Sequence, residues 1–236
     1  MMMAGSSQWP KAARTGMGLI DAAPGTEIRQ HDGAMNNVSD FPVLGASRTQ
    51  PGQEEPARTL FARDQAIIWP NVFEPVLLSR LTALIARATY RSQEIPGVGH
   101  REVEQGGLAS TAILVALRRR ELWTWLESVT GCPPIGAVEG QIAQTRVRAG
   151  DGLDWHDDMV GDRKRLLGIT IGLGDEAYSG GDFHLRRVAD KTELLGFRHD
   201  VPGRGLVFRV SSDLQHRLDP LTGGGPRRIF AGWFMA

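Results

Sequence analysis

The chain has 236 residues, and 27 Lys and Arg balance 27 Asp and Glu, so the formal net charge at pH 7 is zero. This balance gives no support for nucleic acid or an anionic membrane as a partner, and the single cysteine, Cys132, excludes an internal disulfide. No segment approaches the roughly 18 consecutive apolar residues of a membrane span. We therefore expect a soluble, cytoplasmic protein, with an oligomeric state that the sequence leaves open.

The chain changes character near residue 58. Residues 1–57 are rich in Gly, Pro, Ser, Gln and Asn without periodicity, and we expect them to be a disordered tail. Residues 58–134 predict helical support: a short strand at Ile67–Trp69, then helices over Pro75–Thr89 and Ser110–Val129, whose apolar residues recur at helical spacing. Residues 94–107 are glycine-rich and charged, which favours a mobile lid loop.

Beyond Pro134 the pattern is that of short strands separated by Gly, Pro or Asp. Many short strands in series indicate a sandwich or jelly roll. We expect one domain over residues 58–236, mainly β with flanking helices (α+β), in which a double-stranded β-helix of the jelly-roll, cupin-like type fills residues 135–236. The predicted strands cover residues 140–148, 166–173, 181–186, 193–197, 206–210 and 227–234.

Two histidines and an acid form the strongest candidate site. In an extended strand His156 and Asp158 share one face, because side chains alternate with a period of two, whereas Asp157 points away. A histidine from another strand would complete two nitrogens and one oxygen, a set that suits non-haem Fe(II) with open coordination positions. His216 is the preferred second histidine, and His184 and His199 are its rivals.

In their order and separation, several landmarks resemble the Fe(II)/2-oxoglutarate-dependent dioxygenases, and among them the prolyl 4-hydroxylase-like branch. The resemblance covers about Gln141 to Phe234. The landmarks are Gln144–Gly150, the pair His156-x-Asp158, Arg165–Leu173, the turn Gly180-Gly181-Asp182-Phe183, Pro202–Phe208, His216–Pro220, Arg227 and Trp233.

The resemblance implies His156, Asp158 and His216 as catalytic iron ligands. It implies Arg227 as the anchor for the distal carboxylate of 2-oxoglutarate; alternation supports Arg227 over Arg228, because Arg227 shares a face with Trp233. Thr170 would assist at the same carboxylate. Tyrosines of many relatives are absent here, and Arg148, Leu153 and Gly172 stand in such positions, so cosubstrate binding must be rebuilt in part.

The implied function is hydroxylation of an unactivated carbon of a free or peptide-bound amino acid or a related small metabolite, with release of succinate and CO2. The implied cofactors are Fe(II), the cosubstrate 2-oxoglutarate and O2, with ascorbate as a stimulant. The carboxylate of Asp158 disfavours a halogenase, since resembling halogenases carry a small residue there. The alternative is a non-catalytic jelly-roll binding module derived from such an oxygenase.

Overall fold

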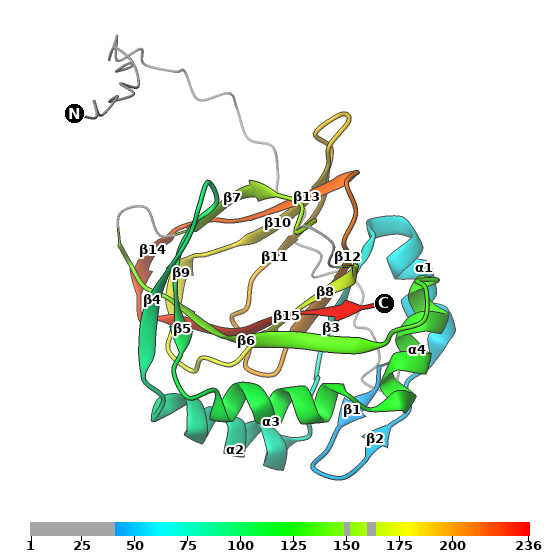
Figure 1. Cartoon of the computed structure of the whole chain (residues 1–236), viewed down its shortest axis with the longest axis horizontal. Helices are drawn as coiled ribbons and strands as arrows, with labels where there is room; N and C mark the ends of the chain where they lie inside the picture. The colour runs from blue at the N-terminus through cyan, green and yellow to red at the C-terminus, as the bar shows by residue number, and fades with distance from the viewer. Residues whose placement is uncertain (1–40, 149–151, 160–163) are drawn as a thin grey trace, which may run out of the picture.

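The computed structural model describes residues 41–148, 152–159 and 164–236. An 11-stranded antiparallel sheet rolls into a nearly closed barrel, and helices cover one side of it (Figure 1). Along the sheet its strands run in the order β11 (Glu193–Phe197), β10 (Phe183–Arg187), β13 (Leu214–Leu218), β7 (Gly152–His156), β5 (Gly99–Glu104), β6 (Ala137–Thr145), β15 (Arg227–Met235), β8 (Arg165–Gly172), β12 (Gly205–Arg209) and β3 (Ala66–Trp69), with β4 (Tyr90–Ile95) paired to β5.

Four helices and two small sheets complete the described part of the chain. The helices are α1 (Glu54–Asp64), α2 (Pro75–Ala86), α3 (Leu108–Leu117) and α4 (Arg120–Thr130). The small sheets pair β1 (Val43–Leu44) with β2 (Thr49–Gln50), and β9 (Tyr178–Gly180) with β14 (Leu221–Gly224). The expected jelly-roll architecture with flanking helices is confirmed. Among the described helices, none is long and apolar enough to cross a bilayer.

Alternation along β8 separates the core from the site. Leu167, Ile169 and Ile171 are fully buried in the cluster that the helices also fill. The intervening positions face the barrel interior, where a Cβ on Gly168 would lie 2.2 Å from the ring of Phe208. One strand thus anchors the helical layer with one face and lines the interior with the other.

The predicted helix over Ser110–Val129 is two helices. The backbone at Arg119 is extended (φ −78°, ψ 130°), and this residue caps the start of α4. Its guanidinium donates to the carbonyl oxygens of Gly45 (2.6 Å), Ala46 (3.0 Å) and Arg48 in the turn between β1 and β2. The helix is therefore interrupted at Arg119, and these bonds connect the N-terminal segment to the domain.

The predicted tail of residues 1–57 needs a correction. Residues 41–57 form β1, β2 and the start of α1, and Phe41 and Leu44 are buried in the main core. The indole Nε1 of Trp69 donates to the carbonyl oxygen of Pro42 at 2.8 Å. The domain therefore includes residues that the sequence assigned to the tail, because a few buried apolar side chains suffice to fix a segment of low periodicity. Residues 1–40 lie outside the described residues.

The predicted lid loop over residues 94–107 is also different. Most of it is strand, because it contains the end of β4 and all of β5, which pair from Tyr90↔Glu104 to Ile95↔Gly99 around a turn at Pro96–Val98. β5 also pairs with β6 and, through Gly99↔Leu153, with β7. The segment is a hairpin held in the sheet, and the charged residues that suggested a loop belong to its paired strands.

Leu44→Ala tests whether the N-terminal segment is part of the folded domain. Leu44 is fully buried, so the truncation should lower the free energy of unfolding by about 2–5 kcal/mol and Tm by roughly 5–15 °C. Thermal unfolding followed by circular dichroism measures the change. Val76→Ala is the control, because Val76 is 61% exposed and should change stability by less than about 0.5 kcal/mol. An unchanged Tm in Leu44→Ala would contradict the assignment.

Candidate active site

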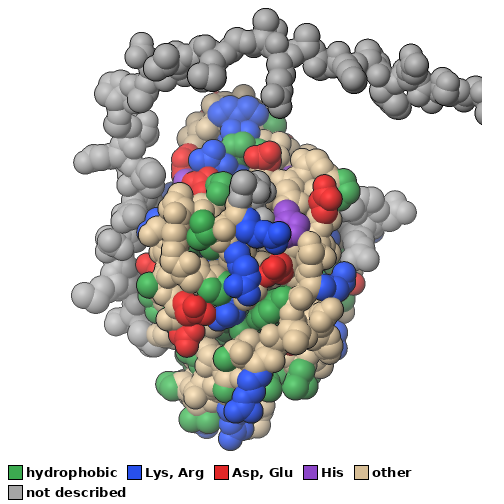
Figure 2. Space-filling model, turned by 90° about the vertical axis from the view of Figure 1, so that its left-hand side faces the viewer, with side chains coloured by type: hydrophobic (Ala, Val, Ile, Leu, Met, Phe, Trp, Pro, Cys, Tyr) green, Lys and Arg blue, Asp and Glu red, His purple; other side chains and the backbone are tan. Residues whose placement is uncertain are grey.

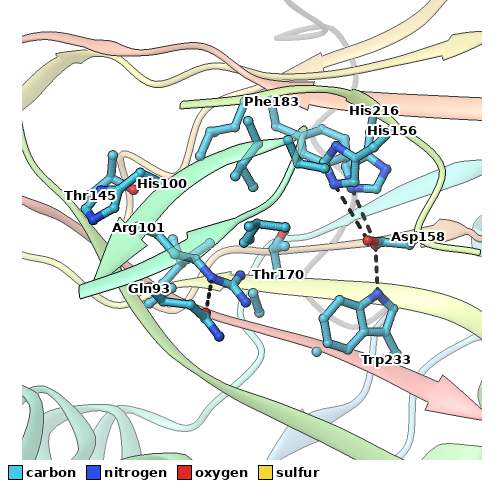
Figure 3. Close-up of a pocket in the computed structure, with 18 of the residues that line it drawn as sticks. Gln93, His100, Arg101, Thr145, His156, Asp158, Thr170, Phe183, His216 and Trp233 are labelled. Carbon is cyan, nitrogen blue, oxygen red and sulfur yellow. Dashed lines mark hydrogen bonds and ion pairs between the residues drawn. The ribbon is translucent and has the colours of Figure 1, made fainter. Parts of the chain in front are cut away.

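His156, Asp158 and His216 converge on one point inside the barrel (Figure 3). One potential ligand atom from each lies within 4.8 Å of those of the others. His156 Nε2 is 3.6 Å from Asp158 Oδ1, and His216 Nε2 is 3.4 Å from Asp158 Oδ2. Two atoms bound to one metal ion at about 2.1 Å and at right angles lie about 3 Å apart. The spacing therefore suits a shared metal ion.

The two histidines meet because their strands are neighbours. His156 is the last residue of β7, and the register places it opposite His216 of β13. Residues directly opposite each other in an antiparallel pair project to the same face, and the two imidazole centroids are 4.2 Å apart.

Asp158 reaches the site by a route that the sequence did not predict. Strand β7 ends at His156, and Asp158 has a left-handed backbone with φ 61°. Strand alternation is thus not the reason that the two residues meet; a tight turn swings the carboxylate back beneath the imidazoles. Asp157 lines the same cavity, and its Oδ1 accepts a hydrogen bond from the backbone N–H of Met159 at 3.0 Å.

Each histidine presents a nitrogen suited to a metal. His156 Nδ1 donates to the carbonyl oxygen of Asp154 at 2.6 Å, so Nε2 is the ring nitrogen that remains for a metal. His216 packs against Phe183 and Phe208, with ring centroids 5.3 and 4.8 Å away. Burial lowers the pKa of His216 to about 4, although Asp158 opposes the shift. Its imidazole is therefore neutral at pH 7, the form that binds metals.

Trp233 and Arg165 hold the acid in place. The Trp233 indole Nε1 donates to Asp158 Oδ2 at 2.7 Å, and Arg165 Nη1 donates to the Asp158 carbonyl oxygen at 2.9 Å. The Arg165 guanidinium also stacks 3.7 Å above the indole centroid. Such outer contacts fix the orientation of a ligating carboxylate.

The rival histidines have other partners. His184 bridges Glu193 and Asp219, with its two ring nitrogens 2.7 and 2.9 Å from their carboxylate oxygens. His199 lies beside Thr170 and Arg227. Only His216 of the three joins the cluster formed with His156 and Asp158.

Arg227 and Arg228 point to opposite sides of the barrel wall, as strand alternation predicts. Arg227 is 2% exposed and lines the cavity with Ile229, Ala231 and Trp233. Arg228 points out of the barrel, where its Nε donates to Gln144 (2.9 Å) and its Nη1 pairs with Glu176 (2.9 Å).

His199 connects Arg227 to Thr170, a role that the sequence analysis did not predict. Arg227 Nη2 is 3.1 Å from His199 Nδ1, and His199 Nε2 is 2.8 Å from Thr170 Oγ1. Burial, followed by the charge of Arg227, holds the pKa of His199 well below its usual range. The neutral ring therefore accepts from Arg227 at Nδ1 and donates to Thr170 from Nε2.

The same histidine lies against Gly172, where the resemblance led us to expect a tyrosine. A Cβ on Gly172 would lie 3.2 Å from the Cβ of His199 and 3.1 Å from the carbonyl oxygen of Val201. The segment that carries His199 thus packs closely against position 172.

Tyr178 of β9 is a second site residue that the sequence analysis missed. Among the described residues, its hydroxyl and the Nε of Arg227 are buried polar atoms without a hydrogen-bond partner. Burial raises the pKa of Tyr178, so the phenol stays protonated and can donate. Tyr178 lies beside Arg227, whose buried Nε suits a bound carboxylate. The available signal was that only two tyrosines occur in the chain, and Tyr178 lies two residues before Gly180.

A cavity of about 460 Å³ connects the His–Asp–His cluster with Arg227, and its volume is within the range of small-molecule sites. It is lined by the cluster of His156, Asp158 and His216, by Thr170 and Arg227, and by the β4–β5 hairpin through Gln93 and Arg101. Its remaining wall is largely apolar, with Leu153, Phe183, Phe208, Leu218 and Ile229.

Comparison with protein families gives one match to this part of the chain. Residues 140–235 match the model of the 2OG-Fe(II) oxygenase superfamily. This segment therefore belongs to that superfamily. It contains the His–Asp–His cluster, Thr170 and Arg227. No curated protein matched the chain.

Solved structures share the fold of this chain. A Pseudomonas putida prolyl-4-hydroxylase is 19% identical, with a TM-score of 0.55 over 76% of this chain and 97% of its own. A Burkholderia pseudomallei 2OG-Fe(II) oxygenase family protein is 16% identical, with a TM-score of 0.58 over 81% and 94%. A Trichoplax adhaerens prolyl hydroxylase in complex with a hypoxia inducible factor peptide fragment is 13% identical, with a TM-score of 0.57 over 77% and 90%. The likeness to the prolyl 4-hydroxylase branch is confirmed for the fold.

The residues of this cavity fit the groups that the matched superfamily implies, Fe(II), 2-oxoglutarate and O2. Two imidazole nitrogens and a carboxylate would hold Fe(II), a donor set that leaves positions open. Arg227, whose buried Nε has no partner among the described residues, would bind the distal carboxylate of 2-oxoglutarate together with Thr170. When bound, the metal and cosubstrate supply the oxidising chemistry.

Replacing an assigned metal ligand should abolish metal binding. We expect Asp158→Ala and His216→Ala each to weaken Mn(II) binding by more than about 100-fold, since even outer contacts of a metal site are worth 10- to 100-fold. Isothermal titration calorimetry with the oxygenase measures the affinity. His184→Gln should keep it, and equal losses in all three variants would refute this ligand set.

Removing the cosubstrate anchor should weaken 2-oxoglutarate binding without loss of the metal. We expect Arg227→Gln to raise the Kd of the Mn(II)-loaded protein for 2-oxoglutarate by roughly 100-fold, because a charge-assisted bidentate contact is lost. Tyr178→Phe should raise it by about 5- to 10-fold, the value of one hydrogen bond. Arg228→Gln, which alters the neighbouring arginine outside the cavity, should leave the Kd unchanged; a larger effect there would reverse the assignment.

Proposed function

We propose that the protein hydroxylates an unactivated carbon of a free or peptide-bound amino acid or a related small metabolite. In the balanced reaction, substrate R–H, O2 and 2-oxoglutarate give R–OH, succinate and CO2. One oxygen atom of O2 enters the substrate, and the other enters succinate as the C1 carboxyl of 2-oxoglutarate leaves as CO2.

The observation that carries the proposal is that the candidate metal ligands and the candidate cosubstrate anchor open into one cavity. His156, Asp158 and His216 line it at one place, and Arg227 lines it with Thr170 at another. A cosubstrate held at Arg227 can then reach the metal while space remains for a substrate. The intact carboxylate of Asp158 supports hydroxylation over halogenation.

In this reaction, residues of the chain orient the candidate metal ligands and the groups that would bind the cosubstrate. Trp233 and Arg165 orient the Asp158 carboxylate, and Phe183 and Phe208 exclude water from the face of His216. His199 keeps Arg227 and Thr170 aligned through its two ring nitrogens. Such preorganisation is the part of catalysis that a protein contributes around a bound metal.

Substrate-triggered formation of succinate tests the proposal. The full chain, with Fe(II), 2-oxoglutarate and ascorbate in air, is screened against amino acids, short peptides and related metabolites, and succinate and the hydroxylated product are quantified by mass spectrometry. We expect a triggering compound to give succinate and product in equal amounts, and omission of Fe(II) or 2-oxoglutarate to abolish both.

Asp158→Ala is the inactive control, since it lacks a candidate ligand. A non-catalytic binding module would give neither succinate nor product, and it would bind its partner equally well after the metal is chelated. That pair of results would overturn the proposal.

A further inference from the structure

Arg101 projects from β5 into the cavity, on the side away from the histidine cluster (Figure 3). Its Nε donates to Oε1 of Gln93 at 2.9 Å, directly across the hairpin in the β4–β5 register. The hydrogen-bond partner that the protein gives to this guanidinium is thus a neutral amide.

The other two arginines that line the cavity already have roles in the candidate active site. Arg165 contacts Asp158 and stacks on Trp233. Arg227 lies with His199 and Tyr178 at the proposed cosubstrate anchor. Arg101 differs, because among the described residues no carboxylate forms an ion pair with it. The face that carries β4 and β5 also has Lys and Arg side chains gathered near its centre (Figure 2).

The acidic groups that line the cavity do not compensate Arg101. Asp158 faces the histidines, Asp157 accepts from the Met159 N–H, and Glu94 is an exposed residue of the hairpin. Burial lowers the pKa of Arg101, and the more distant Asp158 only partly offsets this effect. A partly buried cation without an anionic partner costs free energy, which a bound anion recovers.

The position of Arg101 relative to the candidate metal ligands is fixed by strand pairing. Gly99 pairs with Leu153 of β7, the strand that ends at His156, and Glu102 pairs with Gln144 of β6. A Cβ on Gly99 would lie 2.0 Å from the carbonyl oxygen of Gly152, so the hairpin and β7 are in backbone contact. Arg101 is therefore held as a rigid part of the cavity wall.

We propose that Arg101 binds a carboxylate of the substrate, so that the enzyme acts on a small free carboxylic acid, such as a free amino acid, and not on an internal residue of a peptide. This inference rests on the proposed hydroxylase function. A guanidinium offers two parallel donors to a carboxylate. With Arg227 occupied by the cosubstrate, Arg101 is the cation of the cavity that remains for the substrate.

Matched pairs of acids and amides test this inference. The Fe(II)-loaded full chain is assayed for 2-oxoglutarate-dependent succinate formation with each L-amino acid, with simple carboxylic acids, with the primary carboxamide of each, and with short peptides blocked at both ends. We expect the triggering compounds to be the acids, and each carboxamide to be at least about 10-fold weaker in kcat/KM.

Variants assign the effect to Arg101. Arg101→Gln should raise KM for the triggering acid by roughly 10- to 100-fold, the value of charge-assisted hydrogen bonds, and remove the preference for acid over amide. Arg101→Lys should give a KM between those of the unaltered protein and Arg101→Gln. The Kd for 2-oxoglutarate, measured by calorimetry on the Mn(II)-loaded protein, should stay unchanged. Arg91→Gln is the matched control, because Arg91 is an exposed arginine of the same hairpin.

The outcomes separate this inference from the proposed function. Equal turnover of acids and amides, turnover of blocked peptides alone, or an unchanged KM in Arg101→Gln would overturn the role of Arg101 while the hydroxylase function stands. A weaker Kd for 2-oxoglutarate in Arg101→Gln would move this residue to the cosubstrate and also refute the inference. Absence of succinate with every compound would refute both proposals.

Discussion

The hydrogen bond from the Trp233 indole to the Asp158 carboxylate is the contact on which the geometry of the site depends. Asp158 lies beyond the end of its strand, with a left-handed backbone, so strand pairing alone does not fix its side chain. Trp233 belongs to β15, in the middle of the rolled sheet, and supplies that restraint from across the barrel at 2.7 Å. The two histidines need no such help, because the register of β7 and β13 already places them together.

The two faces of the barrel strands have different roles: one face packs on the helical core and the other lines the cavity. The outward apolar residues of β8, β12 and β15 join the helical core, whereas the inward residues of β8 and β15 line the cavity. Small residues are needed inside, since Phe208 occupies the space beside Gly168. Polar groups of the interior are then held by buried contacts such as that between His199 and Thr170.

Sequence reasoning recovered the strands that carry strong apolar patterns and the residues that converge at the site. Arg227 could be separated from Arg228 because both lie in a regular strand, where alternation holds. The same rule selected Asp158, which does converge with His156, but it is not the reason, since Asp158 lies beyond the end of the strand. Tyr178 and His199 were missed because their roles depend on which segments of β9 and of the β11–β12 connection pack beside Arg227, a long-range relation without a local pattern. Residues 41–57 also lack a local pattern, so the sequence did not predict that they belong to the folded domain.

The close packing at Gly172 has a consequence for how this site can be altered. A Cβ at position 172 would lie 3.2 Å from the Cβ of His199 and 3.1 Å from the carbonyl oxygen of Val201, closer than an ordinary van der Waals contact. A side chain there would press on the segment that carries His199, whose two ring nitrogens contact Arg227 and Thr170. A substitution at position 172 would therefore act on Arg227 indirectly, through a shift of His199.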